Sequence, residues 1–432
     1  MLAFTFPGQG SQRAGMGASW VEHESFELVG HASEVLGIDV AALLLEADQE
    51  TLTRTEHAQL ATFVQSLVIL DATERLGLEP AFCAGHSLGE YTALVATGAL
   101  SYEDGLHLVH ERGAAMQDAA DATNGSMLAV LGLDDDDVEA ACQRAEGEVW
   151  VANFNAPGQV TIAGAPDALE RAAEIARSLG AKRVASFPVG GAFHTPLMAA
   201  ARERLRKALQ TVTFHAPEPV VVANVDARAH GEPEEWPGLL SAQLCGPVRW
   251  RQSLLALHAA GARTFVELGP GGVLSGLAKR SLPAGAHAAL SVATPADLEA
   301  LVDHLAGIAR SATAAPDPRV KAVAGFRLAE RIVVSSGTGP FSAEPRLAHL
   351  APTIQAASRH AGGNGASPPD PAPIAVGELV GHAGEHEIRS PFAGTLEGVL
   401  VLEGERVVAG QPVAWLRVSD EELAVPLKED AR

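Results

Sequence analysis

The sequence predicts a mixed α/β protein that ends in an all-β segment. Through most of the chain, short apolar strand patterns alternate with helical patterns, which is typical of a parallel sheet built from βα units. From residue 331 onward, strand patterns follow one another without helices between them. We therefore expect an α/β core that is joined to a smaller β domain.

Composition narrows the class of protein. The chain has 432 residues, of which 47% are hydrophobic, so two or three domains with buried cores are expected. A formal net charge of −22 argues against nucleic acid and against an anionic membrane as the main partner. The three cysteines form no zinc or disulfide pattern, and neither a signal peptide nor an apolar run of the ~20 residues that span a membrane is evident. We expect a cytoplasmic protein without a cofactor or metal.

The first predicted strand, residues 1–6, ends in the glycine-rich turn Pro7-Gly8-Gln9-Gly10-Ser11-Gln12. This turn lacks the lysine of a P-loop and the glycine spacing of a dinucleotide fingerprint. Its amide side chains are the notable groups. Gln9 can line an acyl site, and a backbone N–H here can join an oxyanion hole, while a plain turn is the alternative.

The most informative stretch is Gly85-His86-Ser87-Leu88-Gly89. It lies between a strand pattern at 80–84 and a helical pattern at 90–96, and this order is that of a nucleophile elbow. Its glycines permit a strained, closely packed turn, and the helix N-terminus directs N–H groups toward a developing oxyanion. The pattern predicts that Ser87 is a catalytic nucleophile.

An arginine follows in the next predicted helix, residues 102–120. Arg112 lies in a mostly apolar helix, and a buried guanidinium needs a partner because an unpaired buried charge is costly. Its planar fork suits a carboxylate. The spacing alone favours a substrate carboxylate and a structural ion pair equally.

The order of predicted strands and helices changes at residues 126–187, and this change predicts an inserted subdomain. The order βαββαβ is that of a ferredoxin-like unit, and the core then comprises residues 1–125 and 188–308. The patterns place strands at 127–131, 148–155, 159–164 and 183–187, and helices at 134–145 and 167–179.

A serine nucleophile needs a base, and 16 histidines leave that choice open on composition. His194 stands out because it follows Gly190-Gly191-Ala192-Phe193 in a turn before a helical pattern, where loops place catalytic side chains. As a general base it should lie about 3 Å from the serine oxygen. The core is completed by strands at 220–224 and 264–268, the latter expected to be the last, and by helices at 196–210, 252–260 and 297–308.

Together these motifs make residues 1–305 resemble the malonyl-CoA:acyl carrier protein transacylase family. Seven stretches match in the right order over most of the chain, which is a specific signal. The resemblance implies an α/β-hydrolase-like core, and it favours the substrate carboxylate as the partner of Arg112. The matching stretches are 6–12, 85–91, 112–113, 153–159, 192–194, 243–250 and 267–270.

The resemblance also implies the chemistry. Ser87 attacks the thioester of malonyl-CoA, His194 takes its proton, and the malonyl-serine then passes malonyl to the phosphopantetheine thiol of acyl carrier protein by ping-pong kinetics. This activity, an [acyl-carrier-protein] S-malonyltransferase, serves fatty acid or polyketide synthesis. The resemblance further implies that backbone N–H groups of Gln9 and Leu88 bind the oxyanion, and that Arg112, with Gln9 beside it, binds the malonyl carboxylate. It implies that the carbonyl of Gln243 orients His194. It also implies that Phe193 and Leu88 narrow the pocket and that Asn155 belongs to the substrate site.

Acyl carrier protein is acidic, so it needs a local basic patch on this acidic chain. Two basic pairs are candidate docking residues, with ordinary solvated charge as an equal alternative for each pair. These pairs are Lys182 with Arg183, and Lys279 with Arg280.

The C-terminal part, residues 331–418, resembles a biotinyl/lipoyl barrel on the phrases Ser390-Pro391-Phe392-Ala393-Gly394 and 404–412. An Ala/Pro-rich linker is expected at 309–330, a mobile Gly/Pro-rich insertion at 358–375 and a tail at 419–432.

One departure from that barrel family decides its predicted role. The attachment position falls near His382-Ala383-Gly384-Glu385, and Lys428 is the only lysine after Lys321. We therefore expect a cofactor-free barrel that binds an unknown partner. We interpret His382 and His386 as surface residues, since a third metal ligand type is missing nearby.

Two other functions share the core motifs. A serine thioesterase or esterase has the same elbow, but it needs an acidic third triad member and hydrolyses its substrate when no acceptor is supplied. A non-catalytic scaffold that binds carrier protein would keep a relic site, which the joint presence of Ser87, His194 and Arg112 disfavours.

Overall fold

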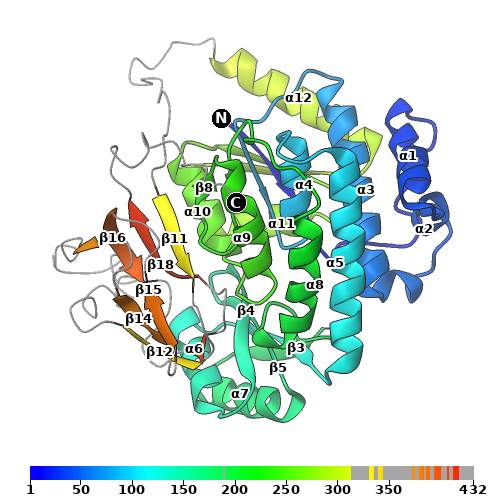
Figure 1. The fold of residues 1–432 in the computed structure, drawn as a ribbon. Coiled ribbons are helices and arrows are strands. Elements are labelled where there is room, and N and C mark those ends of the chain that lie inside the picture. The colour runs from blue at the N-terminus through cyan, green and yellow to red at the C-terminus, as the bar shows by residue number, and fades with distance from the viewer. Residues whose placement is uncertain are drawn as a thin grey trace, which may run out of the picture. The chain divides into compact units, whose positions relative to one another are not determined.

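The computed structural model describes residues 1–187 and 190–312, together with eight strands between residues 330 and 417. The chain divides into two compact units, Met1–Val323 and Ala324–Arg432. Figure 1 shows the elements of both units. Among the described residues, no helix is both long and apolar enough to cross a membrane.

A six-stranded sheet in the order β10-β9-β1-β2-β7-β8 forms the centre of the first unit. Every neighbouring pair is parallel except β7 and β8, which pair antiparallel. The parallel-sheet core predicted from the alternating patterns is thus confirmed. The strands are β1 Leu2–Phe6, β2 Phe82–Gly85, β7 Val221–Val222, β8 Ala229–His230, β9 Thr264–Leu268 and β10 Ala288–Val292.

Two edge strands depart from the prediction. Strand β10 pairs outside β9, which was expected to be the last strand; its alanine-rich sequence has a weak strand propensity, so its pattern is easily missed. Strand β7 is shorter than the predicted 220–224 because the chain turns at once into β8. In that turn Ala227 has a φ of 59°, and the Ala223 N–H donates to Arg228 O at 2.7 Å.

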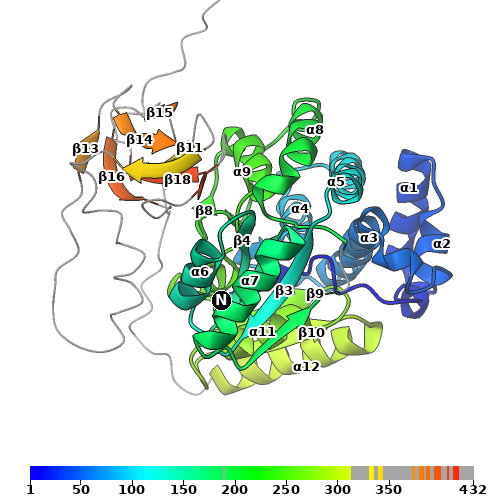
Figure 2. The same cartoon turned by 90° about the horizontal axis from the view of Figure 1, so that it is seen from below.

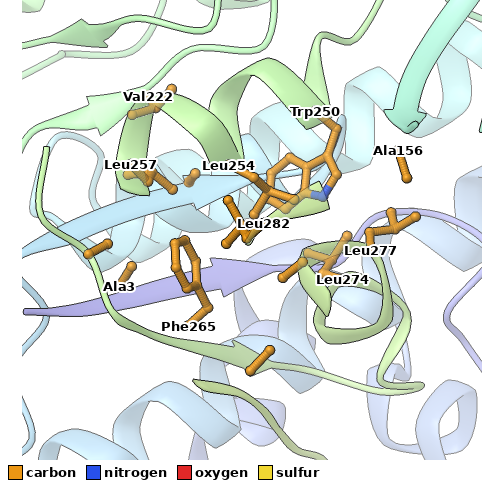
Figure 3. Packing of buried hydrophobic residues seen from close by; sticks show 14 of the residues in the cluster. Ala3, Ala156, Val222, Trp250, Leu254, Leu257, Phe265, Leu274, Leu277 and Leu282 are labelled. Carbon is orange, nitrogen blue, oxygen red and sulfur yellow. The ribbon is translucent and has the colours of Figure 1, made fainter. Parts of the chain in front are cut away.

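Helices cover both faces of the sheet, as a parallel sheet requires. On one face, α10 (Trp250–Ala259) and α11 (Val273–Ser281) pack onto β1 and β9. Figure 3 shows Trp250 from α10 and Leu274 from α11 in this cluster with Phe265. On the opposite face, α3 (Thr55–Glu74) contacts β9 and α4 (Gly89–Ala96) contacts β1. Phe4, the residue after Ala3 in β1, points to that face and is fully buried.

Six further helices complete the described core. The long helix α5 lies along α3 (Figure 1). Helix α12 runs past the predicted end at residue 308 into the segment that was expected to be a linker. Their bounds are α1 Glu27–Leu36, α2 Val40–Leu45, α5 Tyr102–Ala122, α8 Ala199–Leu209, α9 Trp236–Gln243 and α12 Pro295–Ala312, with short 3-10 turns at Ala18–Trp20, Glu24–Phe26, Thr51–Thr53, Pro196–Met198 and Pro233–Glu235.

An inserted subdomain follows α5 and has the predicted element order βαββαβ. Its four strands form an antiparallel sheet in the order β4-β5-β3-β6, and α6 and α7 lie side by side against it (Figure 2). The bounds are β3 Ser126–Leu131, α6 Asp135–Arg144, β4 Val149–Ala156, β5 Gln159–Gly164, α7 Pro166–Ser178 and β6 Arg183–Ser186.

Backbone hydrogen bonds join this subdomain to the core. The Phe154 N–H donates to Val248 O at 2.9 Å, and the Val248 N–H donates to Ala152 O at 2.9 Å. An ion pair between Arg251 of α10 and Asp135 of α6, at 2.6 Å, adds a second connection.

The described part of the second unit consists of strands alone. They form two four-stranded antiparallel sheets, in the orders β11-β18-β16-β13 and β15-β14-β12-β17. Strand β13 lies inside the segment 358–375 that was predicted as a mobile insertion; residues 358–371, 313–329 and 418–432 lie outside the described residues. The bounds are β11 Glu330–Val334, β12 Gly339–Ala343, β13 Ala372–Ile374, β14 Leu379–Ala383, β15 His386–Arg389, β16 Gly394–Val399, β17 Arg406–Val407 and β18 Pro412–Arg417.

Candidate active site

The carboxyl end of β2 presents Ser87 on a strained turn. Its φ of 52° is left-handed, which is uncommon for a residue with a side chain. Glycine is required on both sides, because a Cβ on Gly85 would lie 1.8 Å from the carbonyl carbon of Gly89, and a Cβ on Gly89 would lie 2.0 Å from Phe6 O. The chain therefore passes closely over β1 and leaves the serine side chain partly exposed.

Asn224, two residues after β7, holds this turn. Its side-chain oxygen accepts the Ser87 N–H at 2.6 Å, and its amide nitrogen donates to Gly85 O at 2.6 Å. The Ser87 N–H is thus already engaged. Within the described residues, the backbone N–H groups of Leu88 and Gln9 form no hydrogen bond, so both are available to a ligand.

His194 lies next to the serine oxygen. The distance from His194 Nε2 to Ser87 Oγ is 2.8 Å, and His194 Nδ1 lies 2.8 Å from the carbonyl oxygen of Gln243. Because a carbonyl only accepts, Nδ1 carries the proton and Nε2 is left as the acceptor for the serine O–H. Burial, together with the nearby Arg112 charge, lowers the pKa of His194 to about 3. The imidazole is therefore neutral near pH 7.

Arg112 reaches the same serine from α5. It is 1% exposed, and its Nη2 donates to Ser87 Oγ at 3.0 Å and to Gln243 Oε1 at 2.9 Å. Its Nη1 donates to Gln59 Oε1 at 2.6 Å, and its Cζ lies 5.3 Å from the centre of the Tyr91 ring. The hydrogen bonds given by the guanidinium thus go to neutral groups, which leaves a strong positive charge beside the nucleophile.

The other predicted site residues lie around this cluster. Leu88 is fully buried and Phe193 is 5% exposed. The Gln9 amide nitrogen lies 3.4 Å from Thr55 Oγ1, and the amides that accept hydrogen bonds from Arg112 are those of Gln59 and Gln243.

Asn155 supports the elbow from the subdomain. Its amide oxygen lies 2.9 Å from His86 Nε2, and its amide nitrogen donates to Thr161 Oγ1 at 3.3 Å. These contacts hold the residue that precedes the nucleophile.

The four predicted docking residues are all exposed. One pair flanks the start of β6 in the subdomain, and the other occupies the last turn of α11. Elsewhere in the described residues, no group of three histidine, cysteine or acidic side chains is placed to hold a metal ion.

Three residues of the site were missed in the sequence: Gln59, Glu90 and Asn224. Gln59 and Glu90 are polar side chains buried within helices that are otherwise mostly apolar, at 0% and 1% exposure, and buried polar groups usually have a specific partner. That mismatch was the available signal. Asn224 had a weaker one, its place at the carboxyl end of a predicted strand.

A family model described as the acyl transferase domain matches residues 3–333. The chain belongs to the acyl transferase family. Among its relatives, the malonyl CoA-acyl carrier protein transacylase of Bacillus subtilis is 41% identical over 284 residues, which is 65% of this chain and 90% of the relative. The matched region extends through the segment that was predicted as a linker.

Solved acyl transferases share the architecture. An acyl carrier protein S-malonyltransferase from Vibrio cholerae superposes with a TM-score of 0.67 at 41% identity and covers 69% of this chain and 99% of its own. A structure described as a type II polyketide acyl-carrier protein in complex with its malonyl-transacylase gives a TM-score of 0.68 at 36% identity, with 70% of this chain and 99% of that chain covered. These relatives and solved structures, which match the first unit, are therefore malonyl-transacylases.

Proposed function

We propose that this protein transfers malonyl from malonyl-CoA to the phosphopantetheine thiol of acyl carrier protein through a malonyl-serine intermediate. The observation that carries the proposal is the position of Arg112, whose Nη2 lies 3.0 Å from Ser87 Oγ. A guanidinium fork beside the nucleophile suits an acyl group that ends in a carboxylate. The names of the relatives support the same reaction.

The first half-reaction forms the acyl-enzyme. Ser87 Oγ attacks the thioester carbonyl while its proton moves to His194 Nε2, and the carbonyl oxygen becomes an oxyanion. The free N–H groups of Leu88 and Gln9 stabilise that oxyanion. When the C–S bond breaks, His194 returns the proton to the leaving CoA thiolate.

The second half-reaction runs the same steps in reverse with a new thiol. His194 takes the proton of the phosphopantetheine thiol, the thiolate attacks the ester carbonyl, and the proton passes back to Ser87 Oγ as the ester bond breaks. The carbonyl of Gln243 keeps the imidazole oriented throughout. Phe193 and Leu88 limit the pocket near the α-carbon, although the discrimination against one extra methyl is only ~1–3 kcal/mol.

A serine thioesterase is the alternative function. The partner of His194 Nδ1 supports the transferase, since it is the Gln243 carbonyl at 2.8 Å and not the carboxylate of a triad.

Radiolabelled malonyl-CoA distinguishes these functions. We expect label to accumulate on the wild-type enzyme and to move to added holo acyl carrier protein, with little free malonate. Ser87→Ala should abolish the labelled enzyme. Release of malonate without an acceptor would favour the hydrolase, and label that survives Ser87→Ala would mean that the nucleophile is another residue.

Docking of the acidic carrier protein is assigned to the exposed basic pairs Lys182 with Arg183 and Lys279 with Arg280. Attraction between exposed charges is screened within about 8–10 Å at physiological salt. We therefore expect the KM for carrier protein to rise with ionic strength, and to rise less in a variant with both members of one pair changed to alanine. A KM that does not respond to salt contradicts this assignment.

We further infer that the first unit is an α/β-hydrolase-like core with a ferredoxin-like subdomain at 126–187, and that residues 331–418 form a cofactor-free biotinyl/lipoyl-like module that binds a partner. The antiparallel pairing of the described strands supports the latter. The absence of a lysine between Lys321 and Lys428 supports the lack of attachment. Intact-mass analysis after co-expression with a biotin or lipoate ligase should show no adduct. A cytoplasmic location belongs to the same proposal, since malonyl-CoA and acyl carrier protein are its substrates.

A further inference from the structure

A buried carboxylate lies one amide away from Arg112. Glu90 is 1% exposed and sits in the first turn of α4, three residues after the nucleophile. Its Oε2 accepts a hydrogen bond from Gln243 Nε2, and Gln243 Oε1 accepts one from Arg112 Nη2 at 2.9 Å. The fully buried amide of Gln243 therefore connects the Glu90 carboxyl group to the Arg112 guanidinium.

The two ends fix the direction of this amide. Gln243 Nε2 gives its second hydrogen to Ser87 O at 2.8 Å, so both amide protons have acceptors. A flipped amide would turn its NH₂ toward the Arg112 donors and its oxygen toward the Glu90 and Ser87 oxygens. Glu90 thus keeps an acceptor aimed at Arg112.

Glu90 also contacts the element that holds the elbow. Its Oε1 accepts the backbone N–H of Asn224 at 2.9 Å, and the Asn224 side chain binds both Ser87 N and Gly85 O. Two donors therefore converge on two carboxylate oxygens. Burial raises the pKa of Glu90 to about 7, while these two hydrogen bonds and the positive charge of Arg112 oppose the shift.

We propose that Glu90 is a positioning residue that, through the Gln243 amide, aims the Arg112 guanidinium and thereby sets the preference for an acyl group with a terminal carboxylate. This inference rests on the proposed role of Arg112. The carboxylate balances the buried guanidinium without occupying the face that the substrate needs. A carboxylate bonded directly to Arg112 would compete with malonyl for the same donors.

The sharpest variant is Glu90→Gln, which keeps the shape and removes one acceptor. One of the two converging donors then meets an NH₂ group, so the Gln243 amide is held less firmly and its oxygen is a weaker acceptor for Arg112 Nη2. We expect the ratio of kcat/KM for malonyl-CoA to that for acetyl-CoA to fall roughly 10- to 100-fold, as for the loss of a charge-assisted bond. The ratio should fall mainly because kcat/KM for malonyl-CoA falls, while kcat/KM for acetyl-CoA changes little.

Glu267→Gln is the matched control. Glu267 is another fully buried carboxylate that accepts a backbone N–H, that of Ser275 at 2.8 Å, and burial raises its pKa to about 7 as well. It contacts α11 and not Gln243 or Arg112, so the loss of this carboxylate should leave the selectivity ratio within about twofold, as for a distant, independent site.

A double-mutant cycle separates this proposal from the role of Arg112. If Arg112→Ala leaves the ratio unchanged, the assigned role of Arg112 fails. If Arg112→Ala lowers the ratio but Glu90→Gln does not, or if Glu90→Gln lowers it equally in the Arg112→Ala background, the role of Glu90 fails. Should Glu90→Gln not fold, Glu90→Asp is measured in the same way, and a wild-type ratio in that folded variant overturns the proposal.

Discussion

Two buried histidines in this protein have different charge states near neutral pH: His194 is neutral and His230 is protonated. His194 and His230 are 5% and 4% exposed, and burial disfavours the protonated form of both. His194 is bonded to a serine hydroxyl and a carbonyl, with Arg112 nearby, and its pKa falls to about 3. His230 lies 3.0 Å from both Asp226 and Glu235; these carboxylates outweigh burial and raise its pKa to about 10.

The comparison shows that burial keeps a histidine neutral, as it does His194, unless adjacent carboxylates reverse the effect, as they do for His230. The neutral imidazole of His194 is ready to accept a proton. The charged imidazole of His230 instead binds the β7–β8 hairpin together, since Asp226 lies in the turn and His230 lies in β8. Asn224, which holds the nucleophile turn, precedes that same turn. His194 is placed to take part in the reaction, whereas His230 stabilises the hairpin beside the nucleophile turn.

The largest expected effect distinguishes the two positions by activity. His194→Gln removes the base, so kcat/KM should fall by about 10²–10⁴-fold while the thermal midpoint changes little. His230→Gln should do the reverse, with activity per folded molecule within about threefold of wild type and a lower midpoint. Steady-state kinetics and thermal denaturation on both variants test this. A large loss of kcat at position 230 in folded protein would contradict it.

Arg112 is the positive charge that acts together with burial on His194, and its removal gives the next effect. Arg112→Ala should retain thioester binding but lower the preference for malonyl over acetyl by roughly 10- to 100-fold, because a charge-assisted bond pair is lost. A competition assay with both CoA esters measures the preference directly. An unchanged preference would show that another group recognises the carboxylate.

The smallest effect is a difference in how stability depends on pH. Because the pKa of His230 is raised in the folded protein, its contribution to the free energy of unfolding is complete below pH 6.5 and is lost as pH rises toward 10. The lowered pKa of His194 means that its contribution is complete above pH 6.5 and is lost as pH falls toward 3.

Between pH 7 and 8.5, wild type should therefore lose about 2 kcal/mol more unfolding free energy than His230→Gln. Urea denaturation at several pH values provides the measurement. Parallel pH curves for the two proteins would mean that His230 is neutral in the folded state.

Local patterns were enough to predict the elbow, the βαββαβ order and the positions of Ser87 and His194. Each depends on a short stretch whose residue types match the local backbone. Gln59 and Glu90 escaped prediction because their partners are distant in sequence, with Gln59 bonded to a residue 53 positions later. No periodicity records such a side-chain network. Strand β10 was missed for a different reason, since its pairing with β9 overrides a weak local propensity.

The backbone bonds between Phe154 and Val248 have a consequence for protein engineering. Val248 follows Gln243 closely in the chain, so the outer strand of the subdomain is anchored to the segment that orients the base. A chimera that exchanges residues 126–187 with those of another transferase must exchange residues 246–249 along with them. Chimeras that exchange both segments should retain turnover. Chimeras that exchange residues 126–187 alone should fold with a displaced His194.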